Sequence, residues 1–482
     1  MKNLKKLRYI LMVATTLFVT ACHNDDDINV IVDPTPIDSL PKKEMRAVWI
    51  TTAWGIDWPQ SVYSVAEQKK QYIDYLDRFA ALNINTVIVQ IKPMGDAFYN
   101  SSYEPWSAYI TGTRGKDPGY DVLKFMIDEA HARGLEFHAW MNPYRIATRA
   151  SKDVAYPELD SRVNPNWVVN HEKIQIYNPA LPEVRQRLVD IVKEVITKYD
   201  VDGIDFDDYF YPDPSAAGTM VSDQGDFDTY GNGYATIADF RRANVDKTIQ
   251  AVHDVIVANK PGVLFTISPA ASNDYNYGTL YADVTKWAQE GWIDIVMPQL
   301  YAHTASSSNN FKERVHWWPQ FSFKAVPVIG YALYKFGDNS AGTQFMSVDE
   351  LDLQFKRAAL EPKVKGSAMY SAKSIMDNKI GITDKLAMLY SNPAIIPFIG
   401  RKTEADPAPA TNVRLNGMEL RWDAASGLRS VVYLKTADSK IATVMKITLE
   451  NSYNITLKGE YFVTILNRDN TESLISSFVE YK

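Results

Sequence analysis

From residue 46 to about residue 390, two patterns of apolar and polar residues alternate along the chain. Short runs rich in Val and Ile predict buried strands, and they alternate with longer segments whose apolar residues recur every three or four positions, as in amphipathic helices. The predicted strands are residues 47–51, 86–92, 136–142, 203–207, 264–268, 293–300, 326–330 and 366–370. The predicted helices are residues 65–82, 122–132, 181–199, 237–257, 280–289, 311–318, 348–360 and 383–390.

Eight strand–helix units in succession predict a (β/α)8 barrel, a TIM barrel, over residues 43–398. The strands are continuous apolar runs, as expected for parallel strands that are covered on both faces. A doubly wound open sheet is the alternative, but no glycine-rich dinucleotide or phosphate-binding fingerprint follows the first strand. Long connections rich in Tyr, Trp, Asn and Asp occupy residues 92–120, 142–179 and 209–235, and in a barrel such loops lie on the active face.

The strand–helix alternation stops near residue 400. Residues 399–411 form a linker that contains Pro and Ala, and residues 412–482 alternate in short runs with a period of two. This pattern predicts a small C-terminal β-sandwich of the fibronectin or immunoglobulin type. The segment holds no His/Asp/Glu cluster, so packing against the barrel and glycan binding are both open as its role.

The N-terminal 22 residues have the pattern of an export signal. A basic start is followed by a short apolar run and by Val19-Thr20-Ala21-Cys22, and Cys22 is the only cysteine of the chain. This resembles the lipobox of bacterial lipoproteins, in which the Cys is lipidated; a plain signal peptide is the alternative. Residues 23–42 then form a tether, and residues 23–27 (HNDDD) resemble an acidic surface-export tag. We therefore expect an outer-membrane lipoprotein, facing the periplasm or the cell surface and touching the membrane only through its lipid.

Composition narrows the classes of partner. The 482 residues are 46% hydrophobic and 23% charged, which is typical of a folded protein. A net charge of -7 disfavours nucleic acid as a partner, and a single cysteine excludes disulfides within the chain and thiolate metal clusters. An aromatic content of 12% fits either a large core or a sugar-binding cleft. The oligomeric state is not indicated.

Four aspartates fall within seven positions in and around the fourth predicted strand: Asp202 just before it, Asp205 and Asp207 within it, and Asp208 just after it. Strand alternation directs Asp205, Asp207 and Tyr209 into the barrel, and Asp208 outward unless the strand has already ended. Carboxylates placed close together in an enclosed site raise one another's pKa, so one is ionised and one protonated near neutral pH. Glycoside hydrolysis uses such a pair.

We predict that the catalytic residues come from this cluster, with Asp207 and Asp208 as the reacting pair. Asp205 is either a third member or a buried brace that pairs with Arg46. A metal site is the alternative, because an Asp-x-Asp-Asp sequence offers hard oxygen ligands, but a clear set of further ligands is missing. We therefore predict no metal and no cofactor.

Conventional glycosidases use a second carboxyl group on the other side of the scissile bond. The two groups are about 5 Å apart in enzymes that retain the anomeric configuration and roughly 6.5–9.5 Å apart in enzymes that invert it. No Glu stands at the end of the fifth, sixth or seventh strand. The candidates after other strands are Asp57, Asp96, Glu104 and Asp274, with Asp96 and Asp274 ranked first.

Other residues at strand ends and in loops are candidates for binding a glycan. The third strand offers His138, Trp140 and Asn142, with Arg145 just beyond. The sixth strand offers Gln299 and Tyr301, and the loops offer Tyr209 and Trp54, with Trp58 and Trp106 as further aromatic platforms. Core packing is the alternative for the aromatic residues and for a lone histidine.

Four segments carry a family resemblance: residues 46–52 (RAVWITT), 138–145 (HAWMNPYR), 202–212 (DGIDFDDYFYP) and 296–301 (VMPQLY). They resemble the bacterial glycosyl hydrolase-like family 10 over about residues 43–398. The resemblance implies a barrel glycosidase, often a lipoprotein, that acts on the glycan strands of peptidoglycan. The fourth-strand segment is also similar to the chitinase motif, but Tyr209 occupies the position of the chitinase Glu.

The adjacent aspartates are similar to those of barrel N-acetylhexosaminidases that use the substrate's acetamide as nucleophile. We therefore expect a cell-envelope glycoside hydrolase acting on an N-acetylhexosamine-containing glycan, with peptidoglycan first. A dietary or host polysaccharide, or a non-catalytic glycan-binding role, are the alternatives. Serine hydrolases and zinc proteases are disfavoured, because the Gly-x-Ser-x-Gly and His-Glu-x-x-His motifs are absent.

Overall fold

The computed structural model describes residues 40–307 and 310–482. The predicted signal segment 1–22, the lipidation of Cys22 and nearly all of the tether 23–42 lie outside the described residues and stay predictions.

Eight parallel strand positions form a closed barrel, which confirms the predicted fold class. Around the barrel these are β1 (Met45–Ile50), β2 (Thr86–Lys92), β3 (Glu136–Met141), β7 (Gly203–Phe206), β8 (Leu264–Ile267), β9 (Ile295–Val296), β10 (Val326–Pro327) with β11 (Ile329–Ala332), and β12 (Gly366–Tyr370). β10 and β11 are two parts of the seventh strand, separated only by Val328. β10 pairs with β9 and β11 pairs with β12, so the sheet closes on itself.

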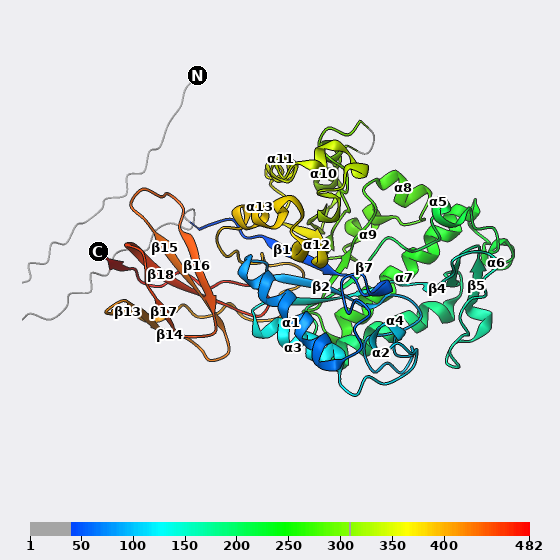
Figure 1. Ribbon diagram of the computed structural model, residues 1–482, viewed down its shortest axis with the longest axis horizontal. Helices are drawn as coiled ribbons and strands as arrows, with labels where there is room; N and C mark the ends of the chain where they lie inside the picture. The colour runs from blue at the N-terminus through cyan, green and yellow to red at the C-terminus, as the bar shows by residue number, and fades with distance from the viewer. Residues whose placement is uncertain (1–39, 308–309) are drawn as a thin grey trace, which may run out of the picture.

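Helices surround the barrel (Figure 1). The main ones are α1 (Val65–Ala81), α3 (Val122–Ala132), α4 (Pro182–Lys198), α7 (Ile237–Asn259), α9 (Val284–Glu290), α10 (Phe311–Phe321), α11 (Asp349–Ala358) and α13 (Ile382–Leu389). The helix expected at residues 280–289 begins later, because the Asp283 side chain accepts a hydrogen bond from Lys286 N and caps α9. Within the described residues, no helix combines the length and the apolar character needed to cross a membrane.

Strand alternation divides the buried residues of the barrel into two layers. One layer lies between strands and helices, and the other fills the barrel interior with residues such as Ala47, Trp49 and Trp140. Arg46 alternates to the outside, where its guanidinium pairs with Glu44 and donates to Asn392 O. The predicted Arg46–Asp205 pair is therefore wrong, because the two side chains lie on opposite faces of the sheet.

The sixth strand is shorter than expected. Regular pairing covers only Ile295–Val296 of the predicted residues 293–300. Pro298 has no N–H group to donate to a neighbouring strand, which interrupts the ladder. Isolated bridges from Gln299 to Ala270 and to Gly330 then continue the sheet toward its carboxyl end.

The long connection after β3 contains a sheet that the periodicity did not predict. β4 (Arg145–Thr148), β5 (Val168–His171) and β6 (Ile174–Tyr177) form an antiparallel sheet in the order β4-β6-β5. Further short helices lie in the loops: α2 (Ala108–Thr111), α5 (Pro214–Ala217), α6 (Gln224–Tyr230), α8 (Asn273–Gly278) and α12 (Ala372–Asp377). In Figure 1, β4, β5 and α6 mark the right-hand end of the molecule.

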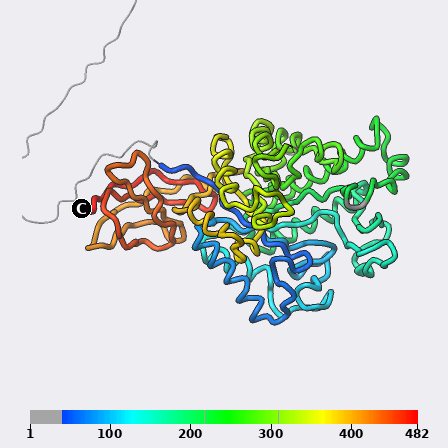
Figure 2. Tube along the Cα trace, turned by 45° about the horizontal axis from the view of Figure 1, so that its top comes forward, coloured from blue at the N-terminus to red at the C-terminus, as the bar shows by residue number. Residues whose placement is uncertain are grey.

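The C-terminal residues form two antiparallel sheets with a shared apolar core. One contains β13 (Thr411–Asn416), β14 (Glu419–Asp423) and β17 (Ser452–Asn454); the other contains β15 (Arg429–Lys435), β16 (Thr443–Thr448), β18 (Gly459–Leu466) and β19 (Val479–Tyr481). The loop after β18 contacts the amino-terminal end of the barrel, where Asn470 donates to Glu136 at the start of β3. Figures 1 and 2 show these sheets at the end of the molecule opposite to β4 and β5.

Candidate active site

A cleft of about 320 Å³ lies at the carboxyl ends of the barrel strands. Many of the residues predicted from the sequence line it: Trp54, Trp140, Arg145, Asp207, Tyr209, Gln299 and Tyr301. They come from different strands and loops, and the barrel brings them together because all of its parallel strands end on the same face.

Asp207 lies at the base of the cleft and is 3% exposed. Its Oδ2 accepts a hydrogen bond from Trp140 Nε1 at 2.9 Å and a longer one from Asn142 Nδ2 at 3.4 Å. Burial raises the pKa of Asp207 to about 6, while the positive charge of Arg145 opposes that rise. The carboxyl group is therefore held in one orientation and titrates near neutral pH.

Asp208 does not line the cleft itself but lies beside it, because β7 ends at Phe206 and strand alternation no longer applies two residues later. Its Oδ1 accepts a hydrogen bond from Gln299 Nε2 at 3.3 Å. Burial raises the pKa of Asp208 to about 7, and the adjacent charge of Asp207 adds to the rise. The pair therefore combines a carboxyl group that ionises first with one that keeps its proton longer.

Asp205 lies deeper in the barrel and is fully buried. Its Oδ1 accepts from Ser268 Oγ at 2.9 Å, and its Oδ2 accepts from Trp49 Nε1 at 3.4 Å. Burial raises the pKa of Asp205 well above its usual value, which favours the protonated form. Asp205 does not line the cleft, and its contacts are those of a brace beneath Asp207.

Two of the predicted binding residues lie below the cleft surface. His138 is fully buried, and its Nε2 faces Glu136 Oε2 at 3.3 Å, toward the amino-terminal end of the barrel. Asn142 is also buried; it donates to Asp207, and its Oδ1 accepts from Arg145 N at 3.1 Å. Asn142 therefore orients the site, whereas His138 packs in the interior away from the cleft.

Arg145 is a buried cation between two exposed aromatic rings. Its guanidinium lies 4.6 Å from the ring centroid of Tyr209 and 5.6 Å from that of Trp54. Tyr209 and Trp54 are 46% and 52% exposed, so their outer faces are open to a ligand. Trp58, by contrast, is fully buried in the core and donates to Gln68 O, so it offers no exposed face.

Three further tyrosines, Tyr301, Tyr334 and Tyr370, line the cleft and pack against one another. Tyr301 lies 6.1 Å from Tyr334 and 5.9 Å from Tyr370, measured between ring centroids. Tyr334 and Tyr370 were not predicted, and neither were Trp49, Gln90 and Ser268, which also line the cleft. Every second side chain of a barrel strand points into the barrel. Applied to the ends of β1, β2, β8 and β12, this alternation would have predicted Trp49, Gln90, Ser268 and Tyr370 from the sequence.

The candidates for a further carboxylate lie elsewhere. Asp57 is fully buried and accepts from Thr51 N and Ser371 Oγ, and Glu104 is buried against Tyr177. Asp274 is exposed on α8, and Asp96 lines a neighbouring pocket. None of the four lines the cleft. Across residues 40–307 and 310–482, no group of three or more His, Cys, Asp or Glu side chains is arranged to hold a metal ion.

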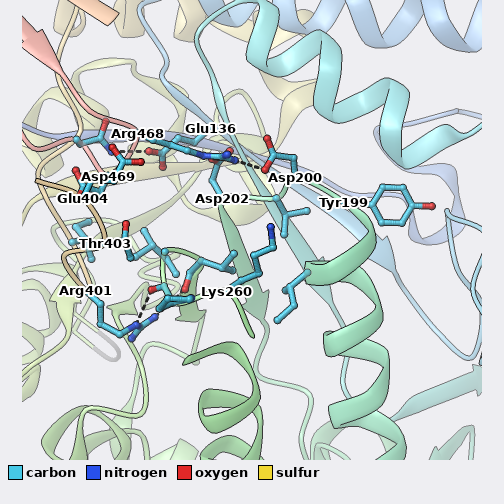
Figure 3. A pocket seen from close by; sticks show the side chains of 18 of the residues that line it. Glu136, Tyr199, Asp200, Asp202, Lys260, Arg401, Thr403, Glu404, Arg468 and Asp469 are labelled. Atoms are coloured by element: carbon cyan, nitrogen blue, oxygen red, sulfur yellow. Dashed lines mark hydrogen bonds and ion pairs between the residues drawn. The ribbon is translucent and has the colours of Figure 1, made fainter. Parts of the chain in front are cut away.

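Another pocket, of about 220 Å³, lies at the opposite end of the barrel (Figure 3). Its walls include Asp200 and Asp202, which precede β7, together with Arg401 of the linker and Arg468 of the loop after β18. Their charges are paired with one another or with nearby acids: Arg468 with Asp200, and Arg401 with Asp294. This pocket is therefore a charged seam between the barrel and the C-terminal sheets.

Comparisons with known proteins agree with the chemistry of the cleft. The family model "Glycosyl hydrolase-like 10" matches residues 44–346. The chain is 40% identical over 390 residues to glycosyl hydrolase YngK of Bacillus subtilis (strain 168), covering 76% of each protein. It is 32% identical over 412 residues to glycosyl hydrolase DigH of Escherichia coli (strain K12), covering 77% of this chain and 93% of that protein.

Among solved structures, the glycoside hydrolase domain of PgaB (BpsB) from Bordetella bronchiseptica aligns with 72% of this chain and 98% of its own length. The sequence identity is 10% and the TM-score is 0.48.

Proposed function

The chain belongs to the glycosyl hydrolase-like 10 family, as its strand-end segments predict, and is a glycoside hydrolase; we propose that it cleaves an N-acetylhexosamine-containing glycan by means of Asp207 and Asp208. The observation that carries this proposal is the pair itself. Asp207 lines a cleft walled by aromatic rings, Asp208 follows it and accepts a hydrogen bond from the cleft residue Gln299, and the two pKa values lie near 6 and 7. Peptidoglycan glycan strands are the first candidate substrate, because their sugars carry acetamide groups.

In the proposed reaction, Asp208 acts as the general acid. It donates its proton to the glycosidic oxygen while the bond from that oxygen to the anomeric carbon breaks. The Gln299 amide, which lines the cleft, donates to Asp208 Oδ1 at 3.3 Å and holds the carboxyl group beside the cleft. The higher of the two pKa values belongs to Asp208, so it is the member of the pair that still holds a proton near pH 6.5.

Asp207 orients and polarises the substrate. As a carboxylate, it accepts a hydrogen bond from the acetamide N–H, and the acetamide oxygen then bonds to the anomeric carbon in place of the leaving group. The negative charge of Asp207 stabilises the positive charge on the resulting ring. Water then attacks the anomeric carbon, Asp208 takes up the proton of that water, and the acetamide is released with retained configuration at the anomeric carbon.

The use of the substrate as nucleophile is supported by the content of the cleft. Among the described residues that line it, Asp207 is the one carboxylate, and Asp208 stands next to it. Tyr209, at the position of the chitinase Glu, turns its ring against Arg145. No other carboxylate of the described residues lines the cleft, so none of them is placed there to serve as the nucleophile.

We also propose that the enzyme works in the cell envelope. The support is the N-terminal pattern that ends in Val19-Thr20-Ala21-Cys22 and the polar tether that follows it. Labelling with a radioactive or clickable fatty acid tests this placement, since Cys22→Ser is expected to abolish incorporation and to release the protein from membrane fractions. Incorporation that persists in Cys22→Ser would contradict the anchor.

The activity is tested on peptide-free peptidoglycan strands and on N-acetylglucosamine oligosaccharides, with products identified by mass spectrometry. We expect wild type to cleave and Asp207→Asn and Asp208→Asn each to lower kcat by about a hundredfold or more, the usual contribution of a general acid–base group. Asp228→Asn, an exposed acid on α6, serves as the control and is expected to retain full activity. Equal cleavage by all four proteins would refute the site, and absence of cleavage by wild type on both glycans would refute the substrate class.

A further inference from the structure

Lys92 is a buried cation at the carboxyl end of β2. Its side chain is fully buried and does not line the cleft. Gln90 of β2 pairs with Trp140 of β3. Lys92 pairs with the next residue of β3, Met141, so Ile91 is an extra residue that makes a bulge in β2. A bulge breaks the alternation of side chains, and bulges are common next to active sites; here Gln90 lines the cleft, whereas Lys92, two residues later, does not.

A cluster of buried charges surrounds the Lys92 ammonium group. Its Nζ lies 3.9 Å from Glu104 Oε1 and 5.8 Å from the centroid of the Tyr177 ring on β6. Arg187 pairs with the same glutamate at 3.5 Å, and the Tyr177 hydroxyl donates to it at 3.0 Å. The other charges that act on Lys92 are those of Arg187, Asp96 and Arg145. Glu104 therefore has two partners besides Lys92, so loss of the lysine does not leave a buried carboxylate unpaired.

Lys92 holds the backbone of Asn142 from both sides. Asn142 N donates to Lys92 O at 2.8 Å. In return, Lys92 Nζ donates to Asn142 O at 3.3 Å and to Met94 O at 2.8 Å. The residue after Asn142 is Pro143, which has no N–H group, so the peptide unit between them has one polar group, the Asn142 carbonyl oxygen. Lys92 is the donor that the described part of the chain supplies to this oxygen, and it thereby fixes the orientation of that peptide unit.

The side chain of Asn142 extends this restraint to the cleft. Its Nδ2 donates to Asp207 Oδ2 at 3.4 Å, and its Oδ1 accepts from Arg145 N at 3.1 Å. Both contacts depend on the direction of the Asn142 side chain, which the backbone sets. Burial raises the pKa of Asp207, and the hydrogen bond from Asn142 is among the contacts that oppose the rise. A tilt of the Asn142 backbone would therefore change both the orientation and the protonation of Asp207.

We propose that Lys92 is a positioning residue for the proposed reaction: it holds Asn142 and, through the Asn142 side chain, keeps the Asp207 carboxyl group oriented for the substrate. Lys92 does not contact the substrate itself, because it does not line the cleft. The inference rests on the proposed function, since it concerns the same Asp207. It adds that the bulge in β2 and the buried charges behind it support the reacting pair.

The test compares Lys92→Met with Arg187→Met in the cleavage assay. Lys92→Met removes the donor to Asn142 O but keeps a side chain of similar length. Asp207 should then ionise only at higher pH, so we expect the acidic limb of kcat/KM to move up by about one pH unit. We also expect kcat at about pH 6.5 to fall by about tenfold, with KM little changed. Arg187→Met removes a positive charge from the same cluster but no contact with Asn142, so the acidic limb should stay in place.

Asn142→Ala tests the route from Lys92 to Asp207. In a chain that carries Asn142→Ala, Lys92 has no side chain through which to act, so adding Lys92→Met should cause no further shift of the acidic limb. A further shift of the same size would show that the lysine acts through its charge, and it would overturn the proposal. The other charged and titratable groups that act on or feel the charge of Asp207 are unchanged in these variants: Asp205, Asp208, Arg145, Tyr209 and Tyr370.

Melting temperatures establish that each variant is folded. If Lys92→Met alone does not fold, Lys92→Met combined with Glu104→Gln removes both charges of the pair and is expected to show the same shift. An acidic limb that stays in place in the folded variant overturns the role of Lys92 and leaves the proposed function standing. If wild type cleaves neither peptide-free peptidoglycan strands nor N-acetylglucosamine oligosaccharides, both proposals fail.

Discussion

At the scale of single residues, the carboxyl groups of Asp207 and Asp208, the proposed reacting pair, differ because their neighbours differ. Asp207 receives hydrogen bonds from Trp140 and Asn142 and lies within the field of Arg145, all of which favour its ionised form. Burial and the adjacent charge of Asp207 favour the protonated form of Asp208, against the opposing effect of its hydrogen bond from Gln299. The same buried site thus separates the pKa values of two chemically identical groups, as the proposed division into a base and an acid requires.

This separation predicts a narrow pH optimum. In the proposed mechanism, Asp207 becomes protonated below about pH 6 and stops polarising the acetamide, and Asp208 loses above about pH 7 the proton that it would donate. We therefore expect kcat to be highest between about pH 6 and 7 and to fall on both sides. Initial rates between pH 4 and pH 9 check this expectation, and a rate that stays constant across that range would contradict it.

Arg145 is expected to control the acidic side of that profile. Its positive charge lowers the pKa of Asp207, so Arg145→Gln should raise that pKa and move the acidic limb to higher pH. The alkaline limb, set by Asp208, should move less. Arg149→Gln is the matched control, because Arg149 also lies over a tyrosine ring, that of Tyr156 at 4.4 Å, but does not line the cleft. An unshifted acidic limb in Arg145→Gln, measured from the same rates, would exclude this role.

At the scale of elements, the register of β7 against β3 places the aspartates at the cleft. Asp205 pairs with Trp140, and Gly203 pairs with His138, so the last paired residues of β7 lie directly beneath the mouth of the barrel. The glycine is required because His138 occupies the space beside it: a Cβ atom on Gly203 would lie 2.5 Å from His138 Nδ1. His138 therefore helps to set the position of the strand that leads into Asp207 and Asp208.

Gly203→Ala is expected to lower the free energy of unfolding by about 2 kcal/mol, the usual cost of overpacking a buried position. The strand must shift or His138 must move, so kcat should fall as well. Urea denaturation and initial rates measure the two effects. Gly225→Ala is the control, since a Cβ atom there meets no other atom within 4 Å. Equal stability of both variants would show that the space beside Gly203 is not filled.

Periodicity predicted the barrel strands well where they are buried on both faces. The strands at 86–92 and 366–370 and the helix at 122–132 have the predicted bounds. The sixth strand was predicted too long, because an apolar run does not reveal the hydrogen bond that Pro298 cannot make. The sheet formed by β4, β5 and β6 was missed, because its short strands lie within a polar connection and pair with one another rather than with the barrel.

The candidate site was predictable to the extent that strand alternation determines it. Alternation directed Trp140, Asp207 and Tyr209 into the cleft, and the structure brings them together there. It also directed His138 inward, but depth along the strand decides whether an inward residue reaches a ligand, and His138 lies too deep. Tyr334 follows β11 in a short 3-10 turn, and no strand or helix pattern marks it in the sequence.

At the scale of the whole molecule, the cleft and the C-terminal sheets occupy opposite ends of the barrel. The seam in Figure 3 joins the C-terminal sheets to the amino-terminal ends of the strands, and the cleft opens at their carboxyl ends. The described chain begins on the same side as the seam, where Lys43 pairs with Glu472. This arrangement directs the cleft away from the C-terminal sheets and from the start of the described chain.

Because the two ends are separate, the seam should support stability without affecting catalysis. Arg401 makes a two-pronged ion pair with Asp294, at 2.9 and 3.0 Å, and the Asp294 carboxylate is almost wholly buried. Arg401→Ala leaves that carboxylate with Phe265 N as its remaining partner, so we expect the free energy of unfolding to fall by about 2 kcal/mol. The Arg468–Asp200 pair is exposed on both sides, so Arg468→Ala should cost less than about 1 kcal/mol.

Urea denaturation of wild type and of the two variants measures this difference, and initial rates at saturating glycan measure catalysis. We expect both variants to retain the wild-type kcat, because neither arginine lines the cleft and the length of the barrel separates the seam from Asp207. A loss of kcat in fully folded Arg401→Ala would show that the seam is coupled to the cleft. Equal destabilisation by the two variants would show instead that burial of Asp294 does not determine how much the seam contributes.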